Sequence, residues 1–150
     1  MNTKAIADAI ATRFTGVTAT SGATTESLVF GPTATLPNSL SKGPALLVFP
    51  PEADLGIALR RRTDTLRFTV RLLRDPLNLP ERVDWLYAWY DALRDLVEAQ
   101  ITLGLAYVSW AQPTAMRMEA DGFTYAGVLY DVVEMEVSVR LDEVVTTLGA

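Results

Sequence analysis

Residues 123–141 are strand-prone almost throughout, and they are too many for one straight strand in a domain of 150 residues. At about 3.3 Å per residue the segment would reach about 60 Å, which is more than a compact domain of this size can pair. Gly127 is therefore expected to mark a bulge or bend. Beyond it the residues alternate, with Val133, Met135, Val137, Val139 and Leu141 on one face and Glu134, Glu136, Ser138 and Arg140 on the other. This alternation predicts a half-buried antiparallel strand.

A second alternating strand is predicted over residues 64–74. Its apolar face holds Leu66, Phe68, Val70 and Leu72, and its opposite face holds Arg67, Thr69 and Arg71. Glu134 and Glu136 alternate in the register that Arg67 and Arg71 need for cross-strand ion pairs. We therefore interpret these arginines as partners of acids on the outer face of a sheet, in preference to a phosphate-binding patch.

The arginine run Arg60, Arg61 and Arg62 comes just before that strand and is less easily neutralised. We expect it to lie in a loop that contacts an acidic partner surface.

Two helices are predicted. The first is a short amphipathic helix from an N-cap at Thr3 to Phe14, because Ile6, Ile10 and Phe14 recur every four residues. The second opens at Pro80 and Glu81 and runs to about Gln100. At 100° per residue its apolar positions cover about 200°, roughly twice the stripe that one packed surface needs.

This wide apolar arc has two interpretations. Trp85 and Trp89 lie one turn apart on its edge, with Leu96 extending the line, and as core residues they need no function. If a strip of the arc stays exposed, its usual meaning is association with another chain. The unpaired edge of the long final strand would favour association in the same way. The acids at 84, 91, 95 and 98 are interpreted as a solvated face.

The remaining segments complete an α+β pattern. Residues 45–49 predict a short buried strand that Pro50 and Pro51 bring to an end, and Asp121-Gly122 predicts a two-residue hairpin turn. A Ser/Thr/Gly/Pro-rich stretch around residues 31–44 is expected to be a flexible loop. We therefore predict one domain over residues 1–150, with a mostly antiparallel sheet, one large helix and the N-terminal amphipathic helix packed on it.

The composition excludes several chemistries. The chain has no cysteine and no histidine, so thiolate zinc sites, Ser-His-Asp hydrolases and Cys-His proteases are excluded. Its net charge of −5 has the wrong sign for a protein that holds DNA by its phosphates. No acid is distinguished from the others as a catalytic group, so we predict no enzyme activity, cofactor or metal. No signal peptide or membrane span is expected.

Taken in order, these elements resemble the tail terminator, or tail-completion, proteins of long-tailed bacteriophages. The resemblance covers an amphipathic helix at residues 3–14, a strand before Pro50-Pro51, the alternating strand 66–74, one large helix after Pro80, and a final strand that begins Tyr125-Ala-Gly-Val-Leu-Tyr-Asp131. It implies a structural α+β protein that forms a ring, typically a hexamer, on the last ring of the tail tube. Such a ring stops tube growth and presents the surface that joins the head.

The resemblance also implies partners and a location. These are further copies of the chain, the tail tube protein and a head-completion or neck protein, at the head-tail junction of a virion made in the bacterial cytoplasm. DNA would pass through the ring without specific binding, as the net negative charge favours. Residues expected at subunit or partner interfaces are Trp85, Trp89, Leu96, Arg60, Arg61, Arg62, Glu134 and Glu136.

Three alternatives remain open. A head-closure or neck protein would share the size and ring symmetry. A tail-tube subunit would have more strand and a stacking hairpin. A small carboxylate-dependent enzyme or ligand-binding domain would use the aromatic arc as a pocket wall.

Overall fold

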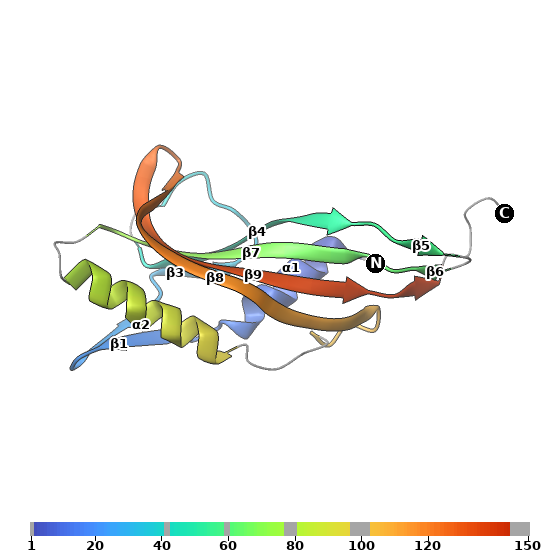
Figure 1. Cartoon of the computed structure of the whole chain (residues 1–150). Helices are drawn as coiled ribbons and strands as arrows, with labels where there is room; N and C mark the ends of the chain where they lie inside the picture. Colours follow the sequence, from blue (N-terminus) through green and yellow to red (C-terminus); the bar gives the residue numbers. More distant parts are fainter. Residues whose placement is uncertain (1, 41–42, 59–60, 77–80, 97–102, 145–150) are drawn as a thin grey trace.

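A computed structural model describes residues 2–40, 43–58, 61–76, 81–96 and 103–144. Its centre is a five-stranded sheet in the order β3 (Phe30–Thr33), β4 (Ala45–Asp54), β7 (Thr65–Arg74), β9 (Val128–Leu141) and β8 (Val108–Tyr125). Neighbouring strands are antiparallel except for β3 and β4, which are parallel. The described chain is thus α+β with a mostly antiparallel sheet (Figure 1).

Both described helices lie on the same side of the sheet (Figure 1). The first, α1 (Thr3–Arg13), has its N-cap one residue before the expected one, because the Asn2 side chain accepts a hydrogen bond from the Ala5 amide at 3.1 Å. Asparagine is among the best N-cap residues, so Asn2 takes the role predicted for Thr3. The second, α2 (Glu81–Leu96), starts where predicted, while its expected end near Gln100 lies outside the described residues.

The main core forms between the helices and the inner face of the sheet. The alternation predicted for β7 and β9 is confirmed, and their apolar residues pack with those of α1, α2 and β4. The largest fully buried members of this core are Ile6, Phe14, Leu46, Phe68, Leu72, Trp89, Leu93, Met135 and Leu141. Burying apolar side chains on one face of each strand leaves part of the opposite face of the sheet for polar residues.

Two smaller sheets flank this layer. The hairpin of β1 (Thr18–Ser21) and β2 (Thr24–Ser27) lies against α2. Beyond the main sheet, β5 (Ile57–Ala58), β6 (Arg61–Arg62) and β10 (Glu143–Val144) pair in the order β10-β6-β5. These three strands continue the lines of β4, β7 and β9 and form an arm that extends past both helices (Figure 1).

The prediction that Pro50 and Pro51 end the strand is wrong. β4 continues through both prolines to Asp54, and its pairing with β7 shifts register between Phe49 and Glu52. Proline lacks an amide donor, and a bulge is one of the places where a strand tolerates that loss.

The hairpin turn was predicted at the wrong dipeptide. The turn between β8 and β9 is Ala126-Gly127, whose φ values of 51° and 81° suit a two-residue hairpin. Asp121-Gly122 instead forms a bulge inside β8, between the pairs of Glu119 and Phe123. Gly122 is required there, because a Cβ atom would lie 2.7 Å from Val132 Cγ1.

The segment around residues 31–44, expected to be a flexible loop, covers part of the outer face of the sheet. Leu36 and Leu40 pack with Phe49, Phe123 and Tyr125 on a second apolar cluster, made by Leu47, Leu73, Tyr130 and Val132. The Tyr125 hydroxyl donates a hydrogen bond to the Pro37 carbonyl oxygen. Residues 41–42 lie outside the described residues.

Candidate interaction surface

Beyond the second apolar cluster, the outer face of the sheet carries a band of ion pairs. Arg71 and Glu134 are direct cross-strand partners on β7 and β9, and Arg71 Nη2 lies 2.9 Å from Glu134 Oε1. This predicted ion pair is confirmed. Glu134 also pairs with Arg117 of β8, so one carboxylate joins two arginines across three strands.

Arg71 is further fixed by two aromatic rings. Its guanidinium carbon lies 4.5 Å from the centre of the Phe49 ring and 4.4 Å from that of Phe123. Both distances are within the range of cation–π attraction. The side chain is therefore held between the apolar cluster and the ion-pair band, and it serves as a structural link.

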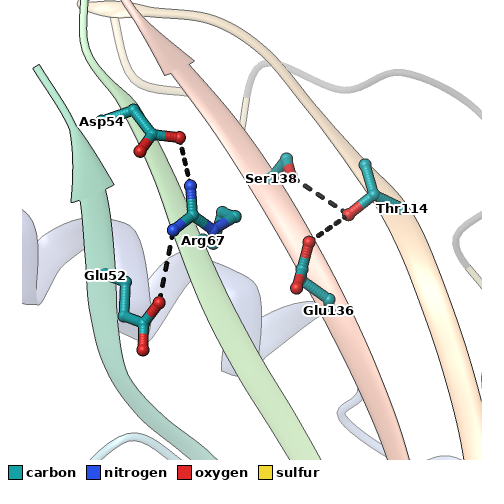
Figure 2. A network of polar contacts seen from close by, with 6 residues as sticks. All are labelled: Glu52, Asp54, Arg67, Thr114, Glu136 and Ser138. Carbon is teal, nitrogen blue, oxygen red and sulfur yellow. Dashed lines mark hydrogen bonds and ion pairs between the residues drawn. The ribbon is translucent and has the colours of Figure 1, made fainter.

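Arg67 does not make the ion pair predicted with β9, because the residue opposite it there is Ser138. It turns instead to β4, where it pairs with Glu52 at 3.3 Å and with Asp54 (Figure 2). The hydrogen bond to Glu52, followed by the charge of Asp54, raises the pKa of the Arg67 guanidinium. The bulge at Pro50-Pro51 is what brings Glu52 opposite Arg67.

Glu136 has a hydroxyl partner in place of the predicted arginine. Its carboxylate accepts a hydrogen bond of 2.9 Å from Thr114, whose hydroxyl also lies 3.0 Å from that of Ser138 (Figure 2). A shallow depression of about 360 Å³ opens beside Glu136 and is lined by Thr69, Ala115, Met116, Arg117, Glu134 and Glu136. The two predicted acids therefore line one half-buried depression on the outer face of the sheet.

Of the two predicted interface tryptophans, one is buried within the chain and the other is half-buried. Trp89 is fully buried, and its indole nitrogen donates a 2.8 Å hydrogen bond to Glu26 of β2. Trp85 is partly buried, with the Arg74 guanidinium 4.9 Å from its ring centre. Trp89 thus offers no surface to a partner, which corrects its assignment to an interface.

A different pair of α2 residues is exposed. Val83 and Tyr87, one turn apart, are 37% and 55% exposed, and Leu96 is 36% exposed on another side of the helix. The width of the apolar arc predicts that some apolar residues of α2 stay exposed. It does not indicate which flank of α2 the sheet leaves uncovered.

Two buried ion pairs, both missed from the sequence, fix α2 and the hairpin β1–β2. Arg74 binds Glu26 through Nε at 2.9 Å and Nη2 at 3.0 Å. Arg82, near the start of α2, binds both carboxylate oxygens of Asp131 at 2.7–2.9 Å and also pairs with Asp121. The hydrogen bond to Asp131 is the main cause that raises the pKa of Arg82.

The predicted arginine loop is partly a strand. Arg61 and Arg62 form β6 in the middle of the arm, whereas Arg60 lies outside the described residues. Their backbone pairs on one side with residues 57–58 and on the other with residues 143–144.

The sheet edge also differs from the prediction. β9 lies between β7 and β8, so the long strand with a free edge in the main sheet is β8. Pro113 and three register shifts interrupt β8. Such irregularities are typical of edges that resist pairing with another strand.

Among the described residues, no three Asp or Glu side chains are grouped to hold a metal ion, and no helix is long and apolar enough to cross a membrane. Comparison with known protein families finds no family that matches this chain, and comparison with curated proteins finds no match.

Proposed function

We propose that this chain is a structural, ring-forming tail terminator of a long-tailed bacteriophage, with no catalytic role. The observation that carries the proposal is the order of elements: a short α1, a Ser/Thr-rich segment, the strands β4 and β7, one large α2, and the long hairpin β8–β9. The sequence resemblance rests on the same order, except that it ends on one closing strand after Tyr125 and does not include the hairpin. In this role the chain caps the tail tube, stops its growth and forms the surface that joins the head.

The surfaces of the described chain suit such a role. The outer sheet face offers charged groups held in place by ion pairs, and α2 offers an exposed apolar pair, Val83 and Tyr87. A ring of six copies needs two complementary surfaces for the two neighbouring copies, and a terminator needs two more for the tube and the neck protein. The net charge of −5 per chain would keep DNA from binding as it passes.

One observation favours a second candidate, the tail-tube subunit. The hairpin β8–β9 and the arm give this chain more strand than we expected from a terminator, and a stacking hairpin is what a tube subunit needs. A terminator forms a closed ring, whereas a tube subunit stacks into filaments, so the two roles differ in the assemblies they form.

The native mass of the purified protein tests the proposal. We expect a discrete species of about six times the 16.4 kDa chain mass in light scattering over a concentration series. Filaments of unlimited length would favour the tail-tube role.

A second assay separates the terminator from a neck protein. Tail tubes of the phage that encodes the chain should stop growing when the protein is added and should show it at one end in electron micrographs. Binding to heads without binding to tubes would contradict the terminator role.

A further inference from the structure

The side of α2 that faces away from the sheet has an apolar half and an acidic half. Val83, Tyr87, Asp91 and Asp95 follow one another every four residues, and residues four apart are neighbours on a helix surface. Val83 and Tyr87 are 37% and 55% exposed, and the side chains of Asp91 and Asp95 are 63% and 66% exposed. These four residues form the α2 ridge.

The acids of α2 have no close cationic partner in the described chain. Arg94 lies 3.9 Å from Asp91 and 4.0 Å from Asp95. Glu81 and Asp84, which are also exposed, make no ion pair with a described residue. Acids on other elements do, and those within 3.3 Å of a cation of the chain are Asp8, Glu26, Glu52, Asp54, Glu119, Asp121, Asp131 and Glu134. The exposed side of α2 therefore keeps an excess of negative charge.

Asp91 and Asp95 do not stabilise the helix that carries them. Aspartate is among the weaker helix formers. The two residues are four positions apart, so their like charges repel each other. The helix dipole favours acids in the first turn and cations in the last, and Asp95 lies in the last described turn. An interaction outside the helix accounts for these two acids better than the stability of α2 does.

We propose that the α2 ridge binds a basic segment of a partner protein. An apolar side chain of the partner packs on Val83 and Tyr87, and its lysine or arginine side chains pair with Asp91 and Asp95. Contacts of this kind combine apolar burial with complementary charge. The inference rests on the proposed function, and it gives the chemistry of the tube or neck subunit that the ring meets.

The charge of the ridge selects this occupant over three others. DNA and an anionic membrane are both negatively charged and would be repelled. A second copy has no basic patch among the side chains that the structure describes. Its described cations are held in ion pairs of their own chain, apart from Arg13 and Arg140, which lie on different elements, α1 and β9.

A synthetic peptide tests the charge of the partner. The probe is a fluorescently labelled amphipathic helix of leucine and lysine, and its counterpart has glutamate in place of lysine. We expect Asp91→Lys/Asp95→Lys to bind the lysine probe about 100-fold more weakly than the wild type, because like charges then face each other. Asp8→Lys/Glu119→Lys makes the same change of net charge on α1 and β8, and it should stay within about threefold of the wild type at about 0.15 M salt, where distant charges are screened.

The apolar half of the ridge has its own variant. Val83→Ser/Tyr87→Ser should weaken binding of the lysine probe about tenfold, because the partner's apolar side chain loses its contact. This loss should persist at about 1 M salt, whereas the difference between the two lysine variants should largely disappear there. Fluorescence anisotropy measures the binding of all variants. Circular dichroism checks their fold, which the lysines at 91 and 95 should preserve because cations are favoured near the end of a helix.

Several results would overturn the proposal. These are a wild type that binds neither peptide or binds the glutamate peptide as tightly as the lysine probe, and equal binding of the lysine probe by the two lysine variants. A change of native mass in Asp91→Lys/Asp95→Lys alone would show that a second copy occupies the ridge. The terminator role is judged separately, because native mass and the capping of tail tubes by the wild type do not depend on the probe.

Discussion

Replacing Trp89 by alanine is expected to lower the free energy of unfolding by about 4 kcal/mol, as large-to-small substitutions of buried tryptophan do. Trp89 has no exposed surface and lies in the core between α2 and the sheet. The substitution leaves a cavity and also removes the indole donor that binds Glu26. Urea denaturation followed by circular dichroism measures the loss.

Two matched variants separate the causes. Trp89→Phe keeps most of the buried ring and removes the hydrogen bond, so we expect a loss of about 1–2 kcal/mol. Trp85→Ala, at a partly buried position on the same helix, should cost less than Trp89→Ala. Equal losses for the two alanine variants would show that Trp89 is not the core residue that its burial indicates.

The sequence predicted the layers of the fold well because a strand alternates its side chains with a period of two. In β7 and β9 one slip of register would turn every apolar residue to solvent, so Phe68 and Met135 identify the inner face without any tertiary information. The same period placed Arg71 opposite Glu134.

The errors come from features that local pattern does not determine. Asp-Gly is a strong turn signal, yet Ala126-Gly127 forms the turn, because the Asp131 carboxylate holds the Asp121 amide at 2.8 Å and Gly122 lies against Val132. These contacts appear only when β8 and β9 are already paired.

The contacts around Glu26 could not be predicted for a related reason. Glu26 lies in a segment with few charges, and its partners Arg74 and Trp89 are 48 and 63 residues further along the chain. No spacing rule connects residues so far apart. One flank of α2 faces the sheet and the hairpin β1–β2, and this orientation buries Trp89 while Val83 and Tyr87 stay exposed. Periodicity alone does not determine which flank turns inward.

The buried Asp131 provides the second large expected effect. Its carboxylate is 1% exposed and accepts hydrogen bonds from Arg82 and from the Asp121 amide, so it joins the start of α2 to the bulge in β8. Asp131→Asn keeps the shape and removes the charge, and we expect it to lower the free energy of unfolding by about 3 kcal/mol, as breaking a buried ion pair does.

The control for this prediction is Asp95→Asn on the solvent side of α2, where the carboxylate is 66% exposed. That change should alter the free energy of unfolding by less than about 1 kcal/mol, because exposed ion pairs contribute little. Hydrogen exchange adds a local readout: in Asp131→Asn the Asp121 amide loses its carboxylate acceptor and should exchange faster than in the control. If the two variants have the same free energy of unfolding and the same exchange rate at the Asp121 amide, the prediction is wrong. The packing of Gly122 would then hold the bulge, and the ion pair would not stabilise it.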